Sequence, residues 1–489
     1  MMQDSVSIKE KDIIKQENKI FYNTDFISQD EEIRKIKDEK RLSYYLIFWS
    51  VMFLIASIVA AIITKEGWGV FDSLKLQLLS PAKLVTDYFR MGSLASTFLN
   101  ASLCGFGCNF MIWITKAKRS ATLFAGYFLV IAHCFYGLNF VNMWLPFFGI
   151  FLYALCFKKR IGDVLHLSMF ATSLGPFISD FLFRYTLGDK FVFGSPQVTW
   201  LGIVISVVFS IIAGFMIPAL LNGMTRMHRG YNLYKAGLAI GFFGFFAHAL
   251  FYKSFHVDTP DAIFRDNAFY EANPNMHYIF VFCFFVIIFL LSIIIGFIGN
   301  GNSFKGYKKL WKCDGWQDDF PVKFGMPLTL INIGIYGLSI LLYFTAIILV
   351  TTGVGFTGPT TGGVIAAITF SASGQTTRNV WPIAVGYIIF MAFYTLVCYT
   401  FKIEALYTIS SQAYISAFAF ATGLCPFAGR YGIKYGIIAG FIDAIICTST
   451  VAIHGGFVLY NGGFTAGFAA LLFICILDFY NIKPKDIVD

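Results

Sequence analysis

The sequence predicts an all-α polytopic membrane protein of about 14 transmembrane helices, arranged as two inverted seven-helix repeats with broken helices. Three observations lead to this prediction. Hydrophobic residues make up 57% of the 489 positions, charged residues make up only 13%, and the mean hydropathy is +0.68. Apolar windows of about 20 residues, each long enough to cross ~30 Å of hydrocarbon, recur along the chain. Segments of the first half also recur in the second half.

Fourteen apolar segments follow one another, and each is a predicted crossing. Alternation of apolar and polar residues, which marks a transmembrane strand, is absent from them. Segments 163–184 and 408–428 each carry a Gly/Pro break, so they either cross completely or re-enter from one side. The others are 43–64, 94–115, 121–138, 143–157, 199–221, 236–251, 277–298, 327–351, 354–373, 380–400, 435–454 and 457–478.

The clearest duplication relates residues 211–242 to residues 437–468, where 12 of 32 positions are identical at a constant offset of 226. Three further landmarks recur in the same order, so the repeat unit is about seven helices, and an odd unit places the second copy upside down. The landmarks are ATSLGPF (171–177) with ATGLCPF (421–427), Asn100 and Gly105 with Asn332 and Gly337, and Gly137, Asn142, Trp144 and Gly149 with Gly374, Asn379, Trp381 and Gly386.

The distribution of Lys and Arg supports this topology, because these residues collect in cytoplasmic loops. With both termini in the cytoplasm and 14 crossings, 28 of the 37 Lys and Arg residues lie inside, against 24 if the two broken segments re-enter. We therefore expect 14 crossings of the inner or plasma membrane. The net charge of +9 needs no nucleic-acid partner. The basic loop at His228 is predicted inside, and the matching loop at His454, which lacks Lys and Arg, is predicted outside.

The charged N-terminal stretch is too long for a secretory signal, so the first apolar segment is expected to stay as a membrane helix. The predicted organisation is a charged cytosolic tail (1–42), a first membrane repeat (43–251), an extracytoplasmic loop (252–276), a second membrane repeat (277–478) that includes a cytosolic linker (299–325), and a cytosolic C-terminal tail (479–489).

The two broken segments are the first candidate for a binding site. Irregular backbone survives at membrane depth only where it is buried in protein or lines a wet cavity. Two such breaks at matching places of inverted halves point to a site near the midplane, although ordinary proline kinks would give the same pattern. The candidate substrate-binding residues are Thr172, Ser173, Gly175, Pro176, Thr422, Gly423, Cys425 and Pro426.

The glycine- and threonine-rich stretch Gly353–Gly363 is a second candidate. It is either an unwound element that offers Thr357, Thr360 and Thr361 to a substrate, or an ordinary outer connection between two crossings.

Asp443 is the only carboxylate in the middle of a confidently predicted span, and its repeat partner is Ile217. An ionisable group there is a functional hypothesis by default. Asp443 is predicted to bind a coupling proton or sodium ion. Alternatively, it is a structural partner of a nearby Lys, Arg or Thr448.

The matched pairs His228 with His454 and Asn142 with Asn379 are predicted to have gating or structural roles. Pairs of small residues four positions apart recur in both halves, and Gly214 and Gly440 each belong to such a pair. These pairs are predicted to let helices pack closely. The ten cysteines read as small buried hydrophobes, and no metal site or cofactor is expected.

Several functional classes lack their signatures. There is no P-loop, HExxH or GxSxG motif, no arginine ladder of a voltage sensor and no TVGYG-type filter.

The combination of FLNASL, the Gly-x4-Asn-x-Trp stretch, ATSLGPF with ATGLCPF, and GPTTGG resembles a bacterial integral-membrane family described as domain of unknown function 1576. This resemblance covers most of the chain after the tail and implies no substrate or catalytic residue. The seven-plus-seven inverted plan is also similar to that of nucleobase and sulfate transporters, which is a likeness of architecture alone.

The expected function is secondary active transport of a small polar or anionic solute by alternating access, coupled to Na+ or H+. The alternatives are a passive channel for a small neutral or anionic solute, and an intramembrane enzyme on a lipid-linked substrate with Asp443 and a histidine as acid and base. The expected partners are the solute, the coupling ion and the lipid bilayer, and a homo-oligomer is compatible with the sequence. We expect a transport protein rather than an enzyme.

Overall fold

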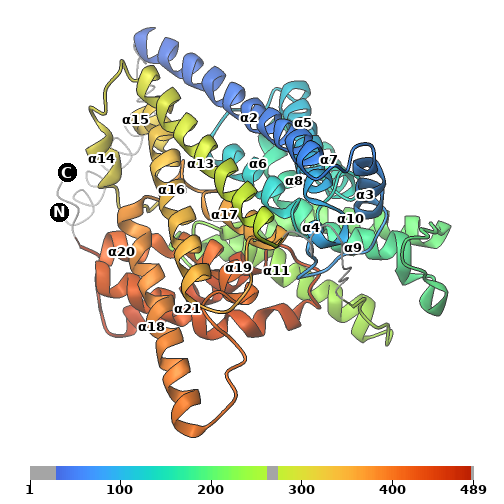
Figure 1. Ribbon diagram of the computed structural model, residues 1–489. Coiled ribbons are helices and arrows are strands. Elements are labelled where there is room, and N and C mark those ends of the chain that lie inside the picture. Colours follow the sequence, from blue (N-terminus) through green and yellow to red (C-terminus); the bar gives the residue numbers. More distant parts are fainter. Residues whose placement is uncertain (1–28, 262–273, 486–489) are drawn as a thin grey trace, which may run out of the picture.

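A computed structural model describes residues 29–261 and 274–485, and all regular secondary structure in these ranges is helical. Figure 1 shows the first half of the chain in blue to green and the second half in yellow to red. The predicted all-α class is confirmed for the described part of the chain. The predicted tails and outer loop fall partly outside it, at residues 1–28, 262–273 and 486–489.

Ten helices of the described residues are long and apolar enough to cross a membrane, as expected of a multi-pass membrane protein. They are Arg34–Ile63, Leu94–Ile114, Ile161–Tyr185, Trp200–Met227, Lys235–Lys253, Met276–Gly299, Met326–Val350, Thr377–Phe401, Ile433–Ile453 and Asn461–Phe479.

The predicted count of 14 crossings is not confirmed, because four of the predicted segments form shorter helices. A 13-residue helix is only about 20 Å long, less than the ~30 Å of hydrocarbon. Two of these helices, α6 and α17, are followed by tight turns with a positive φ at Gly137 and Gly374. The four are α6 (Ala121–His133), α7 (Trp144–Cys156), α17 (Gly358–Ala367) and α19 (Gln412–Ala421).

One side of the fold is a scaffold of four long helices. α2 packs against α5, α13 packs against α16, and α2 and α13 lie side by side (Figure 1). The hydroxyl groups of Tyr45 and Ser292 join α2 to α13 at 2.8 Å. These helices are α2 (Gln29–Ile63), α5 (Leu94–Ile114), α13 (Pro274–Gly299) and α16 (Met326–Val350).

Two further helix pairs are held together by glycine. α7 packs against α10 (Trp200–Met227), where the backbones of Gly149 and Gly214 touch. α18 (Thr377–Phe401) packs against α21 (Ile433–Ile453) through Gly386 and Gly440. The predicted packing role of Gly214 and Gly440 is confirmed, since a side chain at either position would meet the backbone of the facing helix.

Replacing Gly214 with Val should therefore destabilise the protein by about 1–3 kcal/mol, the usual range for overpacking. The matched control is Gly223→Val in the same helix, because a Cβ at Gly223 meets nothing within 4 Å. Thermal unfolding in detergent should show a clear drop for Gly214→Val and little change for Gly223→Val. Equal effects of the two substitutions would disprove this role of Gly214.

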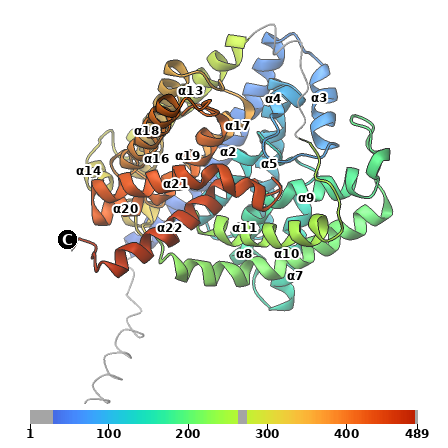
Figure 2. The same cartoon turned by 90° about the horizontal axis from the view of Figure 1, so that it is seen from below.

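The two halves meet where α6 contacts α17 and where α11 (Lys235–His248) packs against α22 (Asn461–Phe479) (Figure 2). Near this centre, α8 (Ile161–Ala171) and α19 each end in a short 3-10 turn. The proline that follows each turn starts a short helix, α9 (Gly175–Asp180) or α20 (Cys425–Tyr431). The predicted breaks are therefore present in both halves.

The remaining helical elements lie in connections. They are α3 (Gly69–Leu78), α4 (Tyr88–Met91), α14 (Tyr307–Trp311), α15 (Phe320–Phe324) and the 3-10 turn Gly188–Lys190. The π-helical turns Phe181–Tyr185 and Ala249–Lys253 instead end two of the membrane-length helices.

Candidate functional site

Two adjoining cavities lie between the halves. The central cavity has a volume of about 110 Å³ and the vestibule about 480 Å³. They share the lining residues Leu84, Thr448 and Val451, so the central cavity lies directly next to the vestibule.

The central cavity is lined by both halves, with most of its wall from the second half. α19 contributes four residues at the spacing i, i+3, i+4 and i+7, which is one face of a helix. Three of them, Ala413, Ser416 and Ala417, have small side chains, which leaves room for the cavity. No charged side chain of the described residues lines it. Its polar lining residues are Tyr136, Tyr407, Ser416, Thr448 and Asn461.

The vestibule, in contrast, carries charge. Lys83, His248 and Lys253 line it together with the single carboxylate Asp258. The Lys83 ammonium donates a hydrogen bond to the Thr259 hydroxyl at 3.3 Å. Burial lowers the pKa of Lys83, although nearby carboxylates oppose this change. We call this end of the molecule the Lys83 face.

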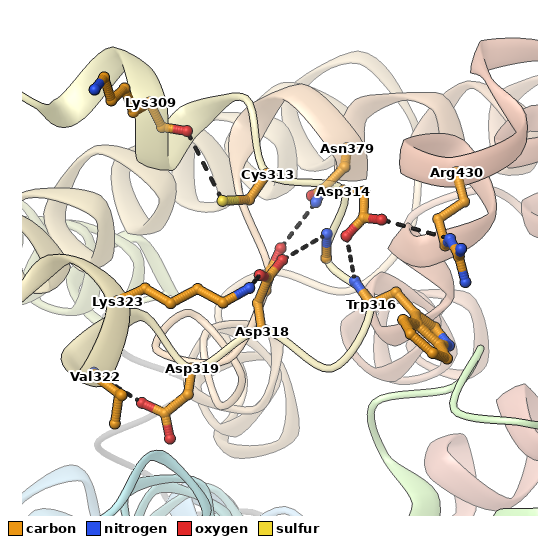
Figure 3. A network of polar contacts seen from close by, with 12 residues as sticks. Lys309, Cys313, Asp314, Trp316, Asp318, Asp319, Val322, Lys323, Asn379 and Arg430 are labelled. Atoms are coloured by element: carbon orange, nitrogen blue, oxygen red, sulfur yellow. Dashed lines mark hydrogen bonds and ion pairs between the residues drawn. The ribbon is translucent and has the colours of Figure 1, made fainter. Parts of the chain in front are cut away.

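At the opposite end of the molecule, which we call the Arg430 face, the linker packs on α20 and on the turn at Gly374, and its polar contacts there are drawn in Figure 3. Gly315 packs on the turn at Gly374, where an added Cβ would lie 2.6 Å from the Gly315 carbonyl oxygen. Both glycines have a positive φ, +82° and +127°, so this contact requires their conformational freedom.

Side chains fasten the linker in place, as Figure 3 shows. The Asp314 carboxylate lies 3.5 Å from the guanidinium of Arg430, which also stacks 4.3 Å from the centre of the Trp316 ring. The Trp316 indole donates to the carbonyl of Arg229 at 2.9 Å. Burial raises the pKa of Asp314, and the Trp316 amide and Arg430 offset only part of this rise. A second ion pair joins Lys323 to Asp318 at 2.5 Å.

The predicted break residues support the site without lining either cavity. The hydroxyl groups of Thr172, Ser173 and Thr422 each donate to a carbonyl three residues earlier, at 2.6–2.9 Å. The break carbonyls instead bind the opposite half: Ser173 accepts from the Leu459 amide, and Gly423 accepts from the Leu233 amide, both at 3.0 Å. The neighbouring candidates Gly175, Pro176, Cys425 and Pro426 are buried in α9 and α20. Their role in substrate binding stays a prediction.

The glycine- and threonine-rich stretch is non-helical only over residues 353–357, because α17 begins at Gly358 and is buried along its length. Thr360 and Thr361 bond with Thr357. Asp87 of the first half accepts from the Gly358 amide at 2.9 Å and so occupies this helix N-terminus. Pro359 and Gly363 of the same helix line the central cavity.

Asp443 is fully buried and bonds to the hydroxyl of Tyr387 on α18, while its Oδ1 has no hydrogen-bond partner among the described residues. The partner is thus a phenol, rather than the Lys, Arg or Thr448 that the sequence suggested. The matching positions of the first half carry Ile217 and Ile150. Apolar side chains therefore suffice for this helix contact, so packing alone does not account for the carboxylate.

The four paired residues with predicted gating or structural roles are buried. Asn142 and Asn379 donate to the carbonyls of Gly137 and Gly374 at 2.9 and 2.8 Å and hold the turns closed. His454 bonds to Asn461 at 2.8 Å, which favours a structural role, whereas neither ring nitrogen of His228 has a partner among the described residues.

Sequence reasoning missed most of the cavity lining. Ser416 and Tyr136 are ordinary polar residues in apolar segments, and no local pattern marks them. Asn461 had a usable signal, because it directly follows the duplicated Leu-Tyr pair at 459–460. Thr448 was noticed only as a neighbour of Asp443.

Neither the curated proteins nor the solved structures contain a match to this chain. A family model described as "Protein of unknown function (DUF1576)" matches residues 53–253 and 299–479. This match covers more than half of the chain, and it agrees with the resemblance found in the sequence motifs. The chain therefore belongs to the DUF1576 family.

Proposed function

We propose that this protein is a secondary transporter of a small, uncharged polar solute that works by alternating access. The observation that carries the proposal is a central cavity that adjoins a vestibule at the Lys83 face, while the linker packs over the Arg430 face, where neither cavity has a lining residue. A transporter captured with one end open and the other closed has this arrangement.

The proposal includes two inverted repeats. Asn100 donates to the carbonyls of Cys134 and Leu138, and Asn332 donates to Ser371 and Gln375, which lie 237 positions further along the chain. The matched loops also lie at opposite ends: Arg229 contacts the linker at Trp316, and Gly456 contacts Leu84 at the vestibule. Local bonds of the same kind at opposite faces are what inversion predicts.

The orientation follows from charge. The Arg430 face gathers the lysine-rich linker, the basic loop at Arg229 and, from the C-terminal segment, Lys485, whose amide donates to the Arg430 carbonyl. We therefore assign this face to the cytoplasm, with both termini, and the Lys83 face to the outside. Fourteen crossings remain part of the proposal only if the four short helices cross together with their flanking turns.

The lining suggests the substrate class. Hydroxyl and amide groups can orient a polar solute, whereas a charged solute would lose its hydration without gaining a counter-charge in the central cavity. Cavity size limits the solute to a small molecule.

The charges near the two ends suggest how access alternates. Arg430 pairs with Asp314 of the linker, and its repeat partner Asp180 lies close enough to Lys83 to influence it electrostatically. Asp180 is bound by Arg184 at 2.6 Å and by Tyr252 at 2.6 Å. We propose that Lys83 and Asp180 approach when the outer end closes, in place of the Asp314–Arg430 pair.

A thermal-shift screen of purified protein against sugars, polyols, nucleobases, small amides and small anions tests the function. One class of uncharged solute should raise the unfolding temperature, because at about 100 times Kd a ligand stabilises by about 2.7 kcal/mol. Thr448→Val should remove the shift, and Ser449→Ala, on the exposed side of the same helix, should keep it. Stabilisation by anions alone would contradict the proposed solute class.

A passive channel is the second candidate, and the basic vestibule favours it, because Lys83 and Lys253 would attract a small anion. A channel equilibrates the solute across proteoliposomes, whereas a transporter accumulates it against an imposed ion gradient. The enzyme alternative requires Asp443 beside a histidine. In the structure Asp443 instead bonds to Tyr387, so this alternative gains no support from the geometry.

A further inference from the structure

His133 and Tyr460 are two buried polar side chains at the centre of the molecule for which the transport proposal gives no role. His133 ends α6, Tyr460 precedes α22, and both are fully buried. Their ring centres are 6.0 Å apart. Neither ring nitrogen of His133, nor the Tyr460 hydroxyl, has a hydrogen-bond partner among the described residues.

A second, repeat-related site, which also takes one residue from each half, shows what packing alone requires. There, Phe370 stands where His133 stands, and Tyr234 stands where Tyr460 stands, with ring centres 4.7 Å apart. The Tyr234 hydroxyl is satisfied: it donates to the Ala366 carbonyl at 2.5 Å and accepts from Gln375 at 3.3 Å. In the first half, the position that matches Gln375 is Leu138.

At this site His133 of the first half therefore stands where the repeat-related site has an apolar ring, and Tyr460 of the second half has no hydrogen-bond partner among the described residues. Buried groups without partners are costly, so each one in a native structure requires an explanation. Packing does not provide it, because phenylalanine fills the equivalent space. The pair also adjoins the central cavity: Tyr136, one turn after His133, lines it, and so does Phe420, which lies 5.5 Å from Tyr460 between ring centres.

We propose that His133 and Tyr460 form a proton-binding site that couples protonation to the opening of the central cavity. This inference rests on the proposed alternating access. The neutral imidazole accepts one proton from a hydronium ion on its unprotonated ring nitrogen: the N–H bond forms as an O–H bond of hydronium breaks and water is left. The same proton later returns to water. A proton fits this site better than a metal ion, because one imidazole and one phenol are too few ligands to hold a cation.

The direction of the coupling follows from burial. In the described state the imidazole is fully buried and no charged side chain of the described residues pairs with it, so the protonated ring is strongly disfavoured there. The titratable groups that face the His133 ring are the phenols of Tyr136 and Tyr460. Among the described residues, His133 takes part in no ion pair. Acidification should therefore lower the population of the conformation with the open vestibule. It should raise that of a conformation in which the protonated His133 ring is hydrated or hydrogen-bonded to a partner.

The test uses a cysteine at Ser416, in a background without the ten native cysteines, and a membrane-impermeant thiol reagent applied at the Lys83 face. Rates are divided by those of a second reporter, Thr259→Cys in the vestibule, to remove the pH dependence of the reagent. Between pH 8 and pH 5 the ratio should fall, by up to about tenfold per pH unit for one titrating group.

His133→Phe and His133→Gln should abolish this fall, while His166→Phe, another histidine of the same half, should keep it. Tyr460→Phe should displace the midpoint. Because Phe370 fills the matching place, His133→Phe is expected to fold, and His133→Gln preserves polarity without the titration. A fall that persists in both His133 variants, or no fall in the unaltered protein, would overturn the inference. One-sided labelling of Ser416→Cys at pH 8 would still stand as separate support for the proposed function.

Discussion

Replacement of Arg430 by Gln should open the cytoplasmic end and let a thiol reagent reach the central cavity from that side. Arg430 holds the linker twice, by its ion pair with Asp314 and by stacking on Trp316. Both contacts are largely shielded from water, so their loss should favour the opened end by about 1–3 kcal/mol, or about 5- to 150-fold in population. The readout is the labelling rate of Ser416→Cys in inside-out vesicles.

Arg229→Gln is the matched control, since the Arg229 side chain pairs with Asp478 on the same face. That pair is exposed and contributes little, and the Arg229 carbonyl that binds Trp316 is unaffected. The exchange of Asp314→Arg with Arg430→Asp should restore closure. An unchanged cytoplasmic labelling rate in Arg430→Gln would contradict the closing role of this pair.

Asp443→Asn should abolish ion-driven uptake while the protein still folds. The matching helix contact in the first half uses isoleucines, so an uncharged residue is tolerated there. If Asp443 binds the coupling Na+ or H+, that ion stabilises the native state, and the amide loses this stabilisation. The measurement is the unfolding temperature in NaCl against choline chloride and across pH 5–8, followed by uptake of the solute that the thermal-shift screen identifies.

Asp478→Asn, which removes an exposed carboxylate on α22, is the control for a general effect of charge. It should leave both the ion response and uptake intact. If Asp443→Asn keeps the full ion response and full uptake, Asp443 has only a structural role.

The sequence predicts the helical class and the breaks well, because both depend on local chemistry. Long apolar runs can cross a membrane only as helices, and the prolines at 176 and 426 interrupt them wherever they lie. The charge distribution also predicts correctly that Arg229 and the linker lie together, since Trp316 bonds to the Arg229 carbonyl.

The number of crossings and the cavity could not be predicted in the same way. Hydropathy predicts a single apolar segment at 121–138. In the structure α6 ends at His133, and a turn follows that is stabilised by hydrogen bonds from Asn100 and Asn142. The bond from Asn100 reaches a carbonyl 38 positions away, so a local window of sequence does not reveal it. The cavity depends on small residues of α19 meeting α21 across the molecule, so Ser416 and Thr448 carry no local signal. The sequence does mark Asp443, because a carboxylate is rare in such a segment, but Asp443 lines neither cavity.

The most direct test of alternating access asks from which side of the membrane Ser416→Cys is labelled when Asp314 and Arg430 are unaltered. The reagent is applied to right-side-out and to inside-out vesicles at pH 8. We predict labelling from the outer face at a rate at least about tenfold above that from the cytoplasmic face, the ratio for a closed end that is about 1.4 kcal/mol more stable. Equal rates from both faces, as in a continuous pore, or faster labelling from the cytoplasmic face, would contradict the proposed mechanism.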